Sequence, residues 1–245
     1  MGSVAPGALI ELATLFVSAL VAGGYAAFLT VWITPRIRPV VPQASWPAVA
    51  LLSMGLTATL AYFAGPSQSF GVLAALTPIL LLSAYVDART KRLPNAYTLQ
   101  AIMVTLAASV WLLLEGVDWT MVAWTAAIAG ITFVALFAAN VLSRGGLGMG
   151  DVKLAPAMAA GLALLASAAW QEQNVLAAPL MLGLLVIGWL LVSFVLGGLF
   201  VAARAVRARA AGVELADKSF PFGPFMIVAW FAAVPLAPQL PQLFM

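Results

Sequence analysis

The stretch VLAAPLMLGLLVIGWLLVSFVLGGLFVAA, residues 175–203, carries no charged side chain. A membrane-spanning helix needs about 20 mostly apolar residues, and this stretch is long enough to be one. The whole chain has the same character, because 64% of its 245 residues are hydrophobic and 8% are charged, whereas about 25% are charged in an ordinary soluble domain. The composition therefore predicts an integral membrane protein.

Seven further apolar segments accompany this one, at residues 8–33, 46–64, 70–86, 97–114, 119–142, 152–169 and 222–243. We therefore expect an all-α fold, a polytopic transmembrane bundle of about eight helices, forming a single domain over residues 1–245. Segment 152–169 is rich in Ala and Gly, which favours close packing against other helices. Segment 222–243 contains Pro224, Pro235 and Pro238 and is expected to be kinked or short.

The eleven basic residues fall in four of the connecting loops, at 34–45, 87–96, 143–153 and 204–221. With eight alternating helices, these four loops lie on one side of the membrane. The positive-inside rule makes that side cytoplasmic. We therefore expect a protein of the cytoplasmic (inner) membrane with both termini external, surrounded by the lipid bilayer and without a nucleic-acid partner.

The chain has neither cysteine nor histidine. Disulfides, zinc held by Cys or His, a Cys nucleophile and a triad with a His base are therefore excluded. A pair of carboxylates is the hydrolytic apparatus that remains, because two of them can share one proton. One then acts as general base on a water while the other acts as general acid.

Two aspartates flank apolar segments on the side with the basic loops. Asp87 follows segment 70–86 in LLLSAYVDARTKRLPNAYT, and Asp151 precedes segment 152–169 in GGLGMGDVKLAP. Taken alone, Asp87 could be a solvated loop residue and Asp151 a helix N-cap. The glycines before Asp151 favour a functional site, because Gly148 and Gly150 allow positive φ and the close approach of another chain. An extended substrate peptide next to a catalytic carboxylate needs such an approach.

At these residues the chain resembles the type IV prepilin peptidases, which are polytopic aspartyl proteases of the GxGD class. GMGD at 148–151 resembles the second aspartate motif of this family, and DARTKRLPNAYT at 87–98 resembles the first. FPFGPF at 220–225 resembles a third stretch near the C-terminus, and with three motifs in the same order the resemblance covers roughly residues 70–230. The resemblance implies that Asp87 and Asp151 are catalytic.

The resemblance also implies the substrates: prepilins or pilin-like proteins of a type IV pilus or secretion system, cut at the cytoplasmic face between a short basic leader and an apolar helix. It suggests further residues that bind substrate or support the site, namely Gly148, Gly150, Lys91, Pro94, Asn95, Lys153, Pro221, Gly223 and Pro224.

Some family members also methylate the new N-terminus with S-adenosylmethionine. No segment here indicates a nucleotide pocket, and the loop PRIRPVVPQAS lacks the four-cysteine insertion of many members. We therefore expect no cofactor, unless the methyltransferase activity is present. We also expect no metal, because two carboxylates are few ligands for Mg²⁺ or Ca²⁺.

Three alternatives stay open. A presenilin-like or signal-peptide-peptidase-like protease would carry a Tyr-Asp pair and a late Pro-Ala-Leu motif, whereas here Tyr85 lies one residue too early and the late motif is FPFGPF. An ion-coupled transporter would place its carboxylates near the bilayer midplane, whereas Asp87 and Asp151 lie at segment ends. A scaffold subunit without catalytic activity would leave the glycine loop, GGLGMG at residues 145–150, unexplained.

Helix dipoles suggest separate roles for the two aspartates. Asp87 is expected at the C-terminal end of its helix, where an anion is disfavoured, and Asp151 at the N-terminal end, where an anion is stabilised. We therefore expect Asp151 to start as the charged base and Asp87 as the neutral acid, provided that the first of these helices ends at Asp87.

Overall fold

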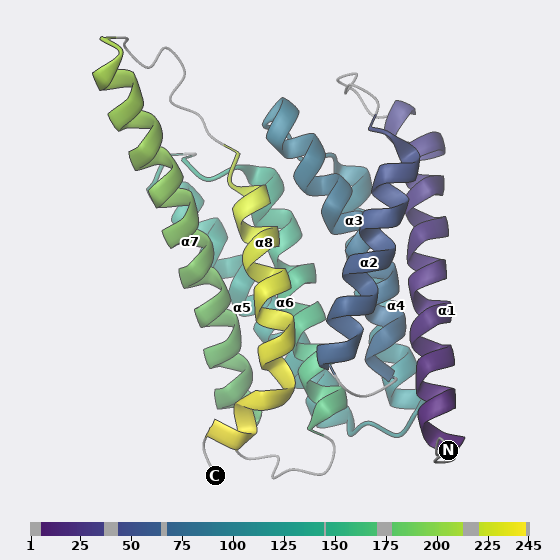
Figure 1. Ribbon diagram of the computed structural model, residues 1–245. Coiled ribbons are helices and arrows are strands. Elements are labelled where there is room, and N and C mark those ends of the chain that lie inside the picture. Colours follow the sequence, from purple (N-terminus) through teal and green to yellow (C-terminus); the bar gives the residue numbers. More distant parts are fainter. Residues whose placement is uncertain are drawn as a thin grey trace.

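The computed structural model describes residues 6–36, 44–64, 68–144, 146–170, 178–212 and 221–243. Eight of its helices are long and apolar enough to span a membrane, and no strand occurs in the described ranges. The α-helices are α1 (Pro6–Phe28), α2 (Trp46–Ala64), α3 (Gln68–Thr90), α4 (Asn95–Leu114), α5 (Trp119–Leu142), α6 (Met149–Ala169), α7 (Ala178–Ala210) and α8 (Gly223–Ala233). The expected all-α membrane bundle of eight spans is confirmed (Figure 1).

Helices α3 and α6 form the centre of the bundle. In their apolar stretches 72% and 78% of the residues are buried, whereas 28% are buried in those of α2, α5 and α7. The expected close packing of the Ala- and Gly-rich segment is confirmed, because a Cβ on Gly161 of α6 would lie 2.8 Å from Leu76 Cδ1 of α3. The two aspartate-bearing helices are therefore the two that neighbouring helices hold most firmly.

Several helices run beyond the apolar segments that predicted them. Helix α3 continues to Thr90, four residues past the expected end, and α6 begins at Met149. Helix α7 continues to Ala210 and carries Arg204, Arg207 and Arg209 in its last turns. Hydropathy marks the part of a helix inside the hydrocarbon, whereas charged residues can continue the same helix into water.

The first and last spans change their helical type near prolines. Helix α1 passes into a π-helical turn, Leu29–Ile33, and a 3₁₀ turn, Thr34–Arg36, around Pro35. Helix α8 gives way to a 3₁₀ segment, Val234–Leu243, where Pro235 and Pro238 have no N–H to donate. The expectation that the last span is short or kinked is confirmed.

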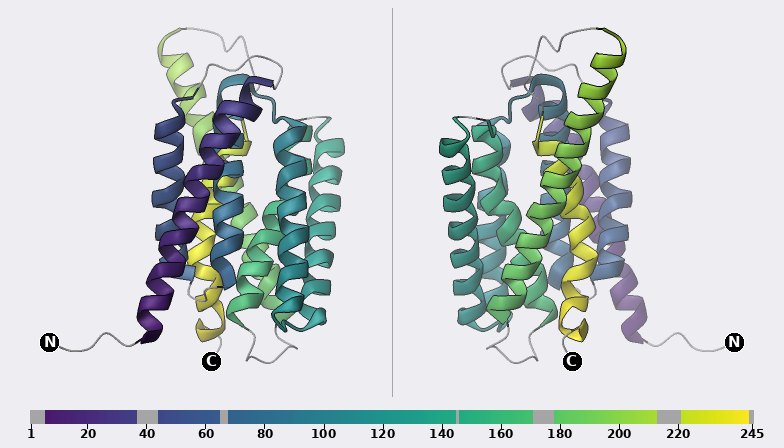
Figure 2. Two further views of the ribbon diagram at one scale, coloured as in Figure 1. Left: turned by 90° about the vertical axis from the view of Figure 1, so that its right-hand side faces the viewer. Right: turned by 90° about the vertical axis from the view of Figure 1, so that its left-hand side faces the viewer.

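The start of α1 and the 3₁₀ segment Val234–Leu243 lie at one end of the bundle, opposite the C-terminal end of α3 and the N-terminal end of α8 (Figures 1 and 2). The described basic residues lie toward the latter end, whereas Glu11, Glu115 and Asp118 lie toward the former. Arg38, Lys218 and Glu172 lie outside the described residues. The charge asymmetry expected from the sequence therefore holds for the part of the chain that the structure describes.

Candidate active site

Asp87 and Asp151 come together at the basic end of the bundle. Asp87 lies in the last turn of α3 and Asp151 in the first turn of α6, and each side chain is 4% exposed. A Cβ placed on Gly223 would lie 2.9 Å from Asp87 Oδ2 and 2.9 Å from Asp151 Oδ1. These two oxygens are therefore no farther apart than twice that distance, which is close enough for one water to contact both.

The N-terminus of α8 closes this carboxylate pair. The N–H of Gly223 donates a hydrogen bond of 3.1 Å to Asp87 Oδ2. This N–H belongs to the first helical residue and has no partner inside its own helix, so it is available to an anion. A side chain at position 223 would collide with both carboxylates. Glycine is therefore required here for space.

Aromatic contacts seat the start of α8 on α7. The ring of Phe222 packs on that of Phe194 with centroids 5.0 Å apart, and the ring of Phe225 packs on that of Phe200 with centroids 5.1 Å apart. Phe222 is buried and immediately precedes Gly223. Offset aromatic pairs of this kind add roughly 0.5–1.5 kcal/mol each beyond the burial of their area. They fix the position from which Gly223 reaches Asp87.

The glycines before Asp151 are needed for space and not for an unusual backbone conformation. Gly148 caps α6 with a φ of −62°, and Gly150 is helical, so the expected positive φ is wrong for both. A Cβ on Gly148 would lie 2.9 Å from Asp151 Oδ2, and one on Gly150 would lie 2.5 Å from Leu93 Cβ. The chain that approaches Gly150 is thus the protein's own connection between α3 and α4.

Asn140 anchors the glycine loop and lies outside the three sequence motifs. Its buried side-chain amide, near the end of α5, donates a hydrogen bond to the carbonyl oxygen of Leu147. A signal was present in the sequence, because an amide side chain within a segment as apolar as 119–142 needs a polar partner. The bond ties α5 to the residue that precedes Gly148.

A cavity of about 360 Å³ opens onto the two aspartates. Five of the expected supporting residues line it, namely Lys91, Asn95, Gly148, Gly150 and Lys153. Sequence reasoning missed the other lining residues, which are Arg92, Leu93, Met149 and Phe222. Lys91, Arg92 and Lys153 thus line the same cavity as the two buried carboxylates.

The three prolines expected at the site do not line this cavity and lie instead at or just before the starts of helices α4 and α8. Pro94 is the N-cap of α4 with φ −68° and ψ 133°, and Pro224 lies in the first turn of α8. Pro221 precedes α8. Proline suits these positions, because its fixed φ matches the first turn of a helix and its missing N–H costs no helical bond there.

Two hydrogen bonds fix residues that line the cavity at the aspartates. Lys153 Nζ donates to Asn95 Oδ1 over 3.4 Å, which joins the starts of α6 and α4. Lys91 adopts the left-handed conformation with φ 53°, and its N–H donates to the carbonyl oxygen of Asp87 over 2.7 Å. The chain therefore turns away from α3 directly after the helical turn that carries Asp87.

The hydrogen bonds favour the reverse of the expected roles of the aspartates. Helix α3 ends at Thr90, so Asp87 lies within its last turn and not at its end, which weakens the helix-end argument for a neutral Asp87. Asp87 accepts the N–H of Gly223, whereas Asp151 Oδ1 is buried without a partner among the described residues. A hydrogen bond to a charged group is worth about 1.5–3 kcal/mol, and a helix dipole typically 0.3–1 kcal/mol. The geometry therefore favours Asp87 as the carboxylate and Asp151 as the neutral acid.

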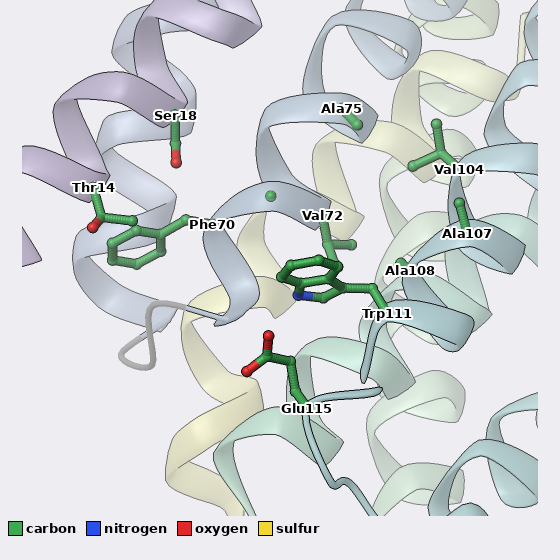
Figure 3. Close-up of a pocket in the computed structure, with 11 residues that line it drawn as sticks. Thr14, Ser18, Phe70, Val72, Ala75, Val104, Ala107, Ala108, Trp111 and Glu115 are labelled. Carbon is green, nitrogen blue, oxygen red and sulfur yellow. The ribbon is translucent and has the colours of Figure 1, made fainter. Parts of the chain in front are cut away.

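Within the described ranges, no group of three or more acidic, His or Cys side chains could hold a metal ion. A different cavity, of about 690 Å³, lies at the far end of α4 between α1, α3 and α4. Figure 3 shows Glu115 there as the acidic side chain, below Trp111. None of its lining residues belongs to the aspartate site. The two cavities are therefore separate sites.

The fold and the site define a class, a helical membrane protein with two carboxylates facing each other at one end of the bundle. A family model, the type IV leader peptidase family, matches residues 74–202, which include both aspartates and the glycine loop. The match covers more than half of the chain, and the protein belongs to this family of membrane peptidases. No curated protein and no solved structure matches the chain. The family match favours a leader peptidase over the presenilin-like, transporter and scaffold alternatives.

Proposed function

We propose that this leader peptidase is an aspartic endopeptidase that removes the basic leader from prepilins or pilin-like proteins, with Asp87 and Asp151 as its catalytic pair. The observation that carries the proposal is the contact of both buried carboxylates with one residue, Gly223, beside a cavity. Two carboxyl groups at this separation can share one proton.

The hydrolysis then follows from the hydrogen bonds of the site. The Asp87 carboxylate removes a proton from a water, whose oxygen attacks the carbonyl carbon of the scissile peptide bond. Asp151 gives its proton to the carbonyl oxygen, which yields a geminal diol. When the diol collapses, the C–N bond breaks, Asp87 protonates the departing nitrogen, and Asp151 recovers a proton from a diol hydroxyl.

The proposal places this reaction on the cytoplasmic side of the inner membrane. The aspartates lie at the end of the bundle that carries the described basic residues, and the positive-inside rule assigns that end to the cytoplasm. Methyl transfer is not part of the proposal. Among the described lining residues of the cavity, Phe222 is the aromatic one, and its ring is packed on that of Phe194.

Asn variants of the two aspartates test the catalytic pair. We expect Asp87→Asn and Asp151→Asn each to slow leader removal from a model prepilin by about 10²–10⁴-fold, the usual contribution of general acid–base catalysis. The measurement is the size shift of the prepilin on gels, with the abundance of the peptidase in membranes as the check on folding.

The matched control is Asp118→Asn at the opposite end of the bundle. Asp118 caps α5 by accepting the N–H of Thr120, a role that Asn can also fill. This variant should cut at the wild-type rate. Normal cleavage by either catalytic-pair variant would disprove the assignment.

A further inference from the structure

Three neighbouring cavities share lining residues and are therefore continuous. The cavity at the aspartates shares Asn95 and Lys153 with a second cavity, of about 710 Å³, between α4, α5 and α6. That cavity shares Ile102, Ala129 and Pro156 with a third, of about 310 Å³, between the same helices. We call the second and third cavities together the α4–α5 groove. It leads from the catalytic pair into the membrane-spanning part of the bundle.

The groove exists because α4 and α5 both pack against α6 and scarcely touch each other. In the two views of Figure 2, these two helices lie at one edge of the bundle. The lining residues of α4 lie on one face of the helix: Asn95, Ala96, Thr98, Leu99, Ile102, Thr105, Leu106 and Ser109. At 1.5 Å per residue this face is about 20 Å long, which is most of the hydrocarbon thickness of a bilayer.

The floor and walls of the groove suit another helix. The floor is made of small residues, among them Ala129, Gly130, Ala157 and Ala160, which let a helix backbone approach closely. The groove is open to the side, because Leu99 is 60% exposed. A helix already in the bilayer can therefore enter from the lipid.

A buried threonine lines the groove near its catalytic end. Thr98 lines the groove one turn below Asn95, its side chain is 4% exposed, and its Oγ1 has no hydrogen-bond partner within the described part of the chain. An unpaired hydroxyl in an apolar setting costs free energy until it meets a polar atom.

We propose that the α4–α5 groove binds the apolar helix that follows the cleavage point of the prepilin, with the N-terminal end of that helix beside Asp87 and Asp151. This inference rests on the proposed function and names the surface that recognises its substrate. The continuity of the groove with the catalytic cavity orients the occupant. The leader then lies on the water side, and the scissile bond lies between leader and helix at the two aspartates.

Photocrosslinking tests the groove directly. The probe is a model prepilin with a basic leader, a glycine before the cleavage point and an apolar helix of about 20 residues. A photoreactive residue replaces Leu106 in the groove or, as control, Leu52 on α2, since both are 57% exposed. The full-length protein carries Asp87→Asn, which keeps the prepilin uncut. We expect at least about tenfold more crosslinking at position 106, equivalent to about 1.4 kcal/mol of preferential binding.

A second variant blocks the groove. A Cβ on Gly130 or on Gly55 of α2 would meet no atom within 4 Å, and both glycines are exposed in mid-helix. Gly130→Leu adds a side chain to the lining of the groove and should lower both crosslinking at position 106 and cleavage of the prepilin by about tenfold or more. Gly55→Leu should leave both unchanged. A leader peptide that lacks the helix should be cut equally by Gly130→Leu and wild type.

The outcomes separate the two proposals. Equal crosslinking at positions 106 and 52, or full crosslinking in Gly130→Leu, would overturn the groove assignment. So would labelled lipid crosslinking at position 106 that added prepilin does not reduce, which would make the groove a lipid site. If the wild-type enzyme fails to cut the prepilin although position 106 crosslinks to it, the proposed function fails while the groove stands.

Discussion

At the scale of single residues, the site depends on the absence of a side chain at position 223. The Gly223 N–H binds Asp87, and its Cα faces oxygens of both aspartates. Without this contact, Asp87 Oδ2 would lose the N–H that donates to it. Asp87 accepts a hydrogen bond that stabilises its charged form, whereas Asp151 Oδ1 has no donor among the described residues. This difference suits the proposed roles of Asp87 as base and Asp151 as acid.

Gly223→Ala tests this contact. The added methyl group would lie 2.9 Å from an oxygen of each carboxylate and must displace them. Because a misplacement of about 1 Å can cost 10²-fold in rate, we expect cleavage to fall by about that factor, measured as prepilin processed per unit of enzyme.

The control for Gly223→Ala is Gly183→Ala on α7, where an added Cβ meets no atom within 4 Å. This variant should retain wild-type cleavage. If Gly223→Ala cleaves as fast as this control, the close contact is not part of the catalytic geometry.

The assignment of acid and base is testable by infrared spectroscopy. We expect a band of a protonated carboxyl group at neutral pH that persists in Asp87→Asn and disappears in Asp151→Asn, because Asp151 Oδ1 is buried without a partner in the described structure. Disappearance in Asp87→Asn alone would restore the roles that the helix dipoles suggest.

At the scale of elements, buried donors hold the helices that carry the site. Three indole N–H groups donate to backbone carbonyls: Trp189 to Met226 over 2.8 Å, Trp230 to Met158 over 2.7 Å, and Trp170 to Ala237 over 3.0 Å. These bonds connect α8 and the 3₁₀ segment after it to α6 and α7. The N-terminus of α8 is therefore held in place before any substrate binds.

The glycine loop depends in the same way on Asn140, and Asn140→Leu tests it. The substitution keeps the number and branching of the side-chain heavy atoms but removes the amide that binds the Leu147 carbonyl. An unpaired buried carbonyl costs about 1–3 kcal/mol, so we expect a lower thermal midpoint in detergent and, through the displaced Asp151, about tenfold slower cleavage or more.

Thr59→Val on α2 is the control for Asn140→Leu, because it removes an exposed hydroxyl that bonds only to Gly55 of its own helix. Both the midpoint and the rate should stay near wild type. An Asn140→Leu variant with the same midpoint and rate would show that the loop needs no anchor.

At the scale of the whole molecule, the placement of the basic residues predicts the orientation in the membrane. Single cysteines report it cleanly, since the chain has no native cysteine. Glu115→Cys lies at the exposed end of α4, and Ala211→Cys lies just after α7 at the opposite end. A membrane-impermeant thiol reagent should label position 115 in intact cells and position 211 only after permeabilisation. The opposite pattern would place the aspartates on the external side.

The sequence by itself determined the membrane class, the number of spans, the one-sided distribution of the described cations and the two candidate aspartates. Each of these follows from residues close together along the chain. Hydropathy over about 20 residues is enough to place a helix in the bilayer, and loop charge is enough to choose a side. The extents of α3, α6 and α7 were missed because charged turns continue a helix beyond the hydrocarbon.

Only the tertiary structure decided how these parts meet. Gly223 and Asp87 are separated by 136 positions along the chain, yet the Gly223 N–H donates to Asp87, and from this hydrogen bond we propose the reverse of the expected roles. The need for Gly148 and Gly150 likewise comes from a carboxylate and from Leu93, not from their own φ angles. The α4–α5 groove arises because both helices pack on α6 instead of on each other. Such features depend on distances between segments remote in sequence, which local hydropathy and charge do not encode.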